Sequence, residues 1–167
     1  MSQPITQPTG HYLAELNIAT AIADLDSPEL AGFVNALDKV NSLADKAPGF
    51  VWRLQDDSGN ATDINFSDNP REITNLSVWK SIDDLEHYIW NTAHRGFMQR
   101  GGKWFLPAVK PAFVMWWVPI GHHPSLEEAR TKLVMLRDKG PSVDAFDWAS
   151  LSGTRLWQTK AAPPRKE

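Results

Sequence analysis

The chain has no cysteine among its 167 residues. Disulfides, thiolate nucleophiles and cysteine-ligated metal sites are therefore excluded. A basic excess is also absent, because 17 Lys and Arg stand against 20 Asp and Glu. The resulting net charge of −3 disfavours a general nucleic-acid binder, which needs a basic face. No run of about 20 apolar residues occurs, so we expect no membrane-spanning segment.

The two ends of the chain do not read as parts of the folded core. The first ten residues lack the basic start and apolar stretch of a secretory signal peptide, so we expect a cytoplasmic protein. Residues 1–10 are expected to form a flexible arm and residues 159–167 a disordered tail. Residues 11–158 suit a single domain with a sizeable core, and no repeat or linker divides them.

Tryptophan is abundant where tyrosine is scarce, with eight Trp against two Tyr. Trp buries a large area and its indole N–H needs a partner, so it suits pocket walls and interfaces as well as cores. We expect ordinary core packing to account for most of the eight.

Hydrophobic spacing predicts four strands and three helices. Alternation over His11–Ala19 is typical of a strand, and apolar residues at helical spacing run from Ser27-Pro28 to Pro48-Gly49. Ser125-Leu-Glu-Glu128 is a capping box that starts the last helix. The other predicted elements are strands at Phe50–Gln55, Ile73–Trp79 and Phe113–Val118, a long loop at Asp56–Glu72, and a helix at Ile82–Phe97.

The order β-α-β-β-α-β with an extra C-terminal helix indicates an α+β, ferredoxin-like fold. Its four-stranded antiparallel sheet is expected to carry helices on one face. The other face would then present more aromatic surface than a monomer leaves exposed. We therefore expect a homodimer in which two sheets pack face to face, a dimeric α/β barrel.

The segment from Ser77 to Phe97 concentrates residues that suit a small-molecule pocket. Trp90 and His94 are spaced i,i+4 on the expected helix, so the indole and the imidazole share one face. His94 lies at the edge of the buried stripe and fits three roles: a packing residue, a pocket residue, or a ligand of heme or a metal. As a pocket residue it is the candidate base. No HxxxH motif or carboxylate pair occurs at ligand spacing, so no built-in metal site is expected.

Arg53 lies in the second predicted strand, beside Trp52. A guanidinium that points into the barrel must be paired, because an isolated buried charge is very costly. Glu15 on the first strand is the expected structural partner. The functional alternative is a substrate carboxylate bound by Arg53.

Several motifs rich in aromatic residues and glycine are distributed over residues 11–148. They are Pro48-Gly-Phe-Val-Trp-Arg53, Asn75-Leu-Ser-Val-Trp79, Tyr88-Ile-Trp-Asn-Thr-Ala-His94-Arg-Gly-Phe97, Lys103-Trp-Phe105, Trp116-Trp-Val-Pro-Ile-Gly-His122 and Gly140-Pro-Ser142. Together they resemble the DUF3291 family, a branch of the dimeric α/β-barrel superfamily. That superfamily includes antibiotic-biosynthesis monooxygenases, small stress-response proteins and heme-degrading monooxygenases.

The resemblance implies a protein that binds a small apolar or aromatic molecule. One alternative is a cofactor-independent monooxygenase or related enzyme that acts on an aromatic or polyketide-like substrate. The other is a non-catalytic stress or ligand-carrier dimer. Heme-degrading members carry an Asn on the first strand and a Trp and a His on the second helix, to which Asn17, Trp90 and His94 would correspond. The interval from Trp90 to His94 is shorter than in those members, so no cofactor is expected and heme is the lesser alternative. The candidate substrate-binding residues are Asn17, Arg53, Trp79, Trp90, Phe97, Trp104 and Trp116.

Overall fold

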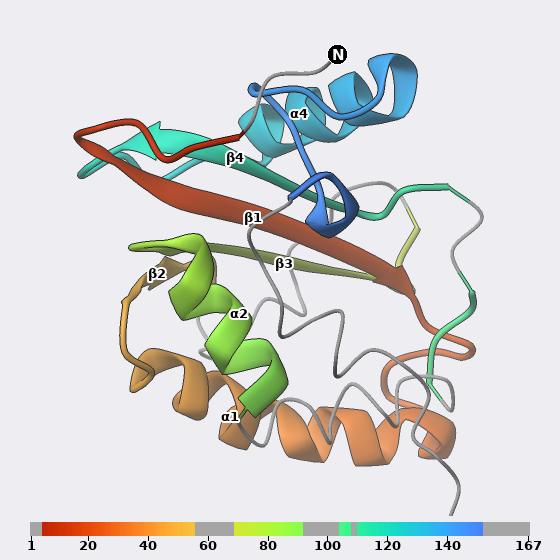
Figure 1. Cartoon of the computed structure of the whole chain (residues 1–167). Coiled ribbons are helices and arrows are strands. Elements are labelled where there is room, and N and C mark those ends of the chain that lie inside the picture. Colours follow the sequence, from red (N-terminus) through yellow and green to blue (C-terminus); the bar gives the residue numbers. More distant parts are fainter. Residues whose placement is uncertain (1–4, 56–68, 92–103, 108–109, 152–167) are drawn as a thin grey trace, which may run out of the picture.

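A four-stranded antiparallel sheet in the order β2-β3-β1-β4 forms the centre of the molecule (Figure 1). The computed structural model describes residues 5–55, 69–91, 104–107 and 110–151, without the side chains of Trp90 and Asn91. The strands are β1 His11–Thr20, β2 Phe50–Arg53, β3 Glu72–Trp79 and β4 Phe113–Pro119. The helices are α1 Ala31–Asp45, α2 Ile82–Asn91 and α4 Leu126–Lys139, with short 3-10 helices at Pro28–Leu30 and Trp148–Ser150.

The secondary structure predicted from hydrophobic spacing is confirmed for the four strands and the three helices. β2 is shorter than predicted, since it ends at Arg53. The predicted end of the second helix at Phe97 lies outside the described residues, and so does most of the loop Asp56–Glu72. The result is a mixed α/β fold with a four-stranded antiparallel sheet.

The helices lie on both faces of the sheet (Figure 1). Successive residues of a strand point to opposite faces. Leu13 of β1 therefore packs in one cluster with Leu85 of α2, whereas Leu16 packs in another with Leu133 of α4. We call these two sides the α1/α2 face and the α4 face. The expectation that helices cover only one face is wrong, because the C-terminal helix folds back over the other.

The α4 face is buried within a single chain. Trp116, Val78 and Val118 on this face are each 1% exposed. The aromatic surface that suggested a sheet-to-sheet dimer is therefore covered without a partner. The homodimer stays a prediction whose support is the family resemblance.

One acidic residue ties α4 to the sheet. Ser125 Oγ accepts a hydrogen bond from the backbone N–H of Glu128 at 3.1 Å, which is the first half of the predicted capping box. The Glu128 carboxylate accepts from the indole N–H of Trp116 at 2.9 Å and pairs with His122 Nε2 at 2.6 Å. The side chain expected to cap the helix thus links α4 to β4 and to the loop between them.

Gly49 brings β2 close to the start of α2. Its φ of +82° lies in the left-handed region, which favours glycine. Its carbonyl accepts from the Lys80 N–H at 2.7 Å. A Cβ at this position would fall on the carboxylate of Asp84, in the first turn of α2. Any side chain here would require the Asp84 side chain to move.

We predict that Leu133→Ala lowers the free energy of unfolding by about 2–5 kcal/mol, through lost burial and the cavity left behind. Leu133 is fully buried between α4 and the sheet. The matched control is its neighbour, Val134→Ala, because Val134 is 45% exposed and its truncation should change stability by about 0.5 kcal/mol or less. Denaturant midpoints of both variants measure the difference. Equal effects would mean that α4 does not pack on the sheet in solution.

Candidate functional site

Polar side chains form a row across the middle of the α1/α2 face. Glu15 of β1 lies opposite Ser77 of β3, and Ser77 lies opposite Arg53 of β2. We call these three residues the polar row. The row beside it is apolar and consists of Trp117, Leu13, Trp79 and Phe50. A polar row in this position needs an explanation, since buried polar groups are stable only when they are hydrogen-bonded.

Glu15 is the centre of the polar row and is 4% exposed. Ser77 Oγ donates to Glu15 Oε2 at 2.6 Å, and the indole N–H of Trp79 donates to Ser77 Oγ at 2.9 Å. Burial raises the pKa of the Glu15 carboxyl from 4.5 to about 8, against the smaller, lowering effect of the Ser77 hydrogen bond. A carboxyl with a pKa this close to neutrality can both accept and donate a proton at physiological pH.

Tyr88 of α2 packs against the indole that donates to Ser77. Its ring stacks on Trp79 with centroids 5.1 Å apart, and its hydroxyl donates to the backbone carbonyl of Val40 at 3.0 Å. Burial, together with the negative charge of Glu15, raises the pKa of Tyr88. Tyr88 is therefore a neutral phenol that joins α2 to α1 and covers the indole next to Ser77.

The ion pair of Arg53 differs from the prediction. Arg53 Nε donates to Asp45 Oδ1 at 2.8 Å and its Nη2 to Asp45 Oδ2 at 3.3 Å. The expected pair with Glu15 is wrong. β2 is an edge strand, so the end of α1 can place the Asp45 carboxylate beside Arg53 and still leave that carboxylate in contact with water. The Asp45 side chain is 44% exposed. Glu15 in the middle of the sheet has no such access to solvent.

The structure places three of the sequence-predicted residues on the α1/α2 face. Arg53 and Trp79 lie there as described, and Trp79 is 1% exposed. Asn17 lies two residues beyond Glu15 on the same face of β1, opposite Asn75 of β3. Both asparagines are exposed, so their amides border the buried polar row on its solvent side.

Two predicted pocket tryptophans lie elsewhere. Trp116 points to the α4 face and donates to Glu128 there, so it does not share a pocket with Glu15. Trp104 belongs to a separate cluster with Leu30 and Phe33, with ring centroids 5.7 Å from Phe33. Sequence spacing could not separate them from the others, because aromatic content alone does not say which side of a sheet a residue faces.

The remaining predicted residues belong to the second helix and the segment after it. The side chain of Trp90 is not described, and His94 and Phe97 lie outside the described residues. The role of His94 as a base therefore stays a prediction. Sequence reasoning considered Glu15 only as a partner for Arg53, although a lone acidic residue within an alternating apolar strand could have identified it.

The described residues contain neither a metal cluster nor a membrane-spanning helix. No three His, Asp or Glu side chains among them come together in a way that could hold a metal ion. Within the same residues, no helix combines the length and apolar character needed to cross a bilayer.

The family described as "Domain of unknown function (DUF3291)" matches residues 12–162. The chain belongs to the DUF3291 family. No curated protein matches it.

Two solved structures are similar to the chain at low sequence identity. One is the NE2512 protein of unknown function from Nitrosomonas europaea, with 11% identity, 71% of this chain and 97% of that chain covered, and a TM-score of 0.43. The other is SnoaB, a cofactor-independent oxygenase from Streptomyces nogalater, with 16% identity, 70% and 98% covered, and a TM-score of 0.37.

We predict that Glu15 makes stability depend on pH. In the unfolded chain the carboxyl titrates at 4.5, and in the folded protein near 8. Between these values the folded state holds a proton that the unfolded state has lost, so the free energy of unfolding falls as pH rises, by at most about 1.4 kcal/mol per unit. The stabilisation that Glu15 contributes is complete below pH 4.5 and is lost above pH 8. Denaturant midpoints over this range should fall more steeply for the natural protein than for Glu15→Gln. Identical slopes would contradict a neutral buried carboxyl.

We also predict that Ser77→Ala raises the pKa of Glu15 further, because the variant removes the hydrogen bond that lowers it. Carbon-13 NMR of the Glu15 carboxyl, followed as a function of pH, measures this directly. Ser81→Ala serves as the control, since Ser81 also carries a hydroxyl but bonds to Asp84 at the start of α2. A titration of Glu15 near 4.5 in the natural protein would refute the assignment.

Proposed function

We propose that the protein binds a small, largely apolar or aromatic molecule at the α1/α2 face and that Glu15 exchanges a proton with it. The observation that carries this proposal is the Glu15 carboxyl, which is buried, is linked through Ser77 to the indole of Trp79, and has a pKa raised to about 8. Perturbed carboxyl groups of this kind are typical of acid–base sites.

The raised pKa determines which substrates Glu15 could deprotonate. A carboxylate of ordinary pKa is a weaker base toward phenols or toward methylene groups activated by a carbonyl. A carboxylate with a pKa near 8 is far better matched to such weak acids, because proton transfer is efficient when donor and acceptor pKa values are close. The stacked rings of Trp79 and Tyr88 provide the apolar surroundings that an aromatic substrate favours.

Deprotonation moves negative charge from Glu15 to the substrate, so the charge on the substrate needs stabilisation. The Asn17 and Asn75 side chains can supply this, because their amide N–H groups are strong donors and both lie on the solvent side of the polar row. Donors placed where negative charge develops lower the barrier to reaction. Arg53 is paired with Asp45 and has a structural role in this arrangement.

We infer a cofactor-independent oxygenation as the reaction class. The carbanion formed when an activated methylene loses its proton can pass electrons directly to dioxygen. The overall change converts one methylene and one dioxygen into one carbonyl and one water, which balances atoms and electrons without a cofactor. The strand order β2-β3-β1-β4 and the antiparallel pairing support a ferredoxin-like unit as the scaffold for this site.

A non-catalytic ligand carrier is the second candidate function. It is favoured by the hydrogen bond that already satisfies Glu15 Oε2, since a structural acid can be held in this way with no proton transfer. In a carrier the ligand binds but is released unchanged. The two functions therefore differ in turnover and not in binding.

We predict that the protein oxidises anthrone, whose methylene lies between two aromatic rings, and that the rate rises with pH through about 8 as Glu15 ionises. Glu15→Gln should lower turnover by about 100-fold or more, the contribution of a general base. Oxygen consumption and quinone absorbance measure the rate. The control is Glu29→Gln, an exposed substitution in the 3-10 helix before α1. Binding of anthrone without oxidation would favour the carrier, and full activity of Glu15→Gln would refute the proposed base.

A further inference from the structure

The β4 edge of the sheet carries backbone groups that no described residue satisfies. The N–H and C=O of Met115 point away from β1 and bond to Phe146 at 2.8 and 2.9 Å. Backbone groups alternate in direction along a strand, so those of Trp117, two residues further, point to the same open side. Among the residues that the structure describes, none bonds to the N–H or the C=O of Trp117.

The part of the β4 edge with unpaired backbone groups, which we call the opening, is only about one residue long at Trp117. On one side, a tight turn joins Ser142 to Ala145 by two backbone hydrogen bonds of 2.8 and 3.3 Å and carries the chain away from the edge. On the other side β4 ends at Pro119, which has no N–H to donate. A long peptide strand therefore cannot add to this edge, whereas a ligand with one donor and one acceptor group can.

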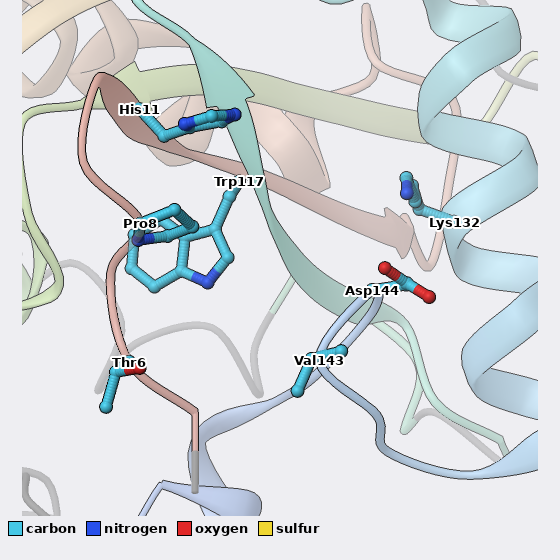
Figure 2. Close-up of a pocket in the computed structure, with 7 residues that line it drawn as sticks. All are labelled: Thr6, Pro8, His11, Trp117, Lys132, Val143 and Asp144. Carbon is cyan, nitrogen blue, oxygen red and sulfur yellow. The ribbon is translucent and has the colours of Figure 1, made fainter. Parts of the chain in front are cut away.

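A cavity of about 340 Å³ lies at this opening (Figure 2). Its volume is at the lower end of the range for small-molecule sites. In Figure 2, Pro8 and Trp117 are drawn on one side of the pocket, and Lys132 and Asp144 on the other. The residues that line it are Thr6, Pro8, His11, Trp117, Lys132, Val143 and Asp144.

The cavity brings together one cation and one anion that are not paired with each other. Lys132 comes from α4 and Asp144 from the tip of the Ser142–Ala145 turn. Neither forms an ion pair with any described residue. A ligand with a carboxylate and an ammonium group would complement both charges at once, and Trp117 offers a free N–H and a free C=O beside them.

We propose that this cavity binds a free aromatic α-amino acid. The ligand carboxylate bonds to the Lys132 ammonium and the Trp117 N–H, and the ligand ammonium bonds to the Asp144 carboxylate and the Trp117 C=O. The aromatic side chain packs against the Trp117 indole and Val143. This site uses none of the residues of the polar row, so a test of this proposal does not depend on the proposed oxygenation.

The probe is L-phenylalanine, titrated by calorimetry into the full-length protein. N-acetyl-L-phenylalanine lacks the ammonium group and mimics a peptide C-terminus, and L-phenylalaninamide lacks the carboxylate and mimics an N-terminus. We expect L-phenylalanine to bind and each derivative to bind at least about tenfold more weakly, the loss expected for one charge-assisted bond. Equal affinity for either derivative would overturn the proposal of a free amino acid and favour a peptide end. No binding of L-phenylalanine at about 10 mM would refute the site.

Two substitutions locate the binding in this cavity. Lys132→Gln and Asp144→Asn should each weaken L-phenylalanine binding at least about tenfold. Asp144→Asn should leave the weak binding of N-acetyl-L-phenylalanine unchanged, since that ligand has no ammonium. The matched control is Lys139→Gln, an exposed lysine in the last turn of the same helix, which should have no effect. Equal weakening by the control would mean that only net charge matters and would overturn the assignment.

Discussion

The burial of one carboxyl in the middle of a β-sheet is the constraint on which the rest of the α1/α2 face depends. Glu15 lies next to the buried Leu13 on its face of β1 and is itself only 4% exposed, so its charged form loses hydration. Only Ser77, itself oriented by the Trp79 indole, donates to it in the described contacts. One hydrogen bond does not offset the loss of solvent, and the carboxyl holds its proton up to a pH near 8.

Acidic side chains at three depths show how burial decides their chemistry. Asp45 at the end of α1 is partly in water and forms an ordinary ion pair with Arg53. Glu128 is intermediate, since it binds a buried indole with one oxygen and a surface imidazole with the other. Glu15 is 4% exposed and forms no ion pair with any residue that the structure describes, and burial raises its pKa to about 8. This gradient is the physical reason for placing the reactive group at Glu15.

The helix α4 forms a second helical layer and covers one face of the sheet. α4 and the loop before it cover the side opposite to Glu15, where Trp52 stacks on His123 with centroids 4.8 Å apart. That side is held together by contacts within the chain. The α1/α2 face keeps exposed asparagines beside a buried acid, and the β4 edge keeps an open pair of backbone groups. The two proposed ligand sites therefore lie on one face and at one edge of the sheet.

Local spacing was enough to predict the strands, the helices and the Ser125 cap, because alternation and 3.6-residue periodicity depend only on near neighbours in the chain. The family resemblance was likewise readable from motifs such as Pro48–Arg53, and the family match confirms it. Only the tertiary structure decided that α4 covers the second face, that Arg53 pairs with Asp45, and that Trp116 and Glu15 lie on opposite sides. These facts depend on which segments that are distant in the sequence pack together, and on how much each contact excludes water from the side chains. The pKa of Glu15 follows from that loss of water, so no reading of β1 alone could have determined it.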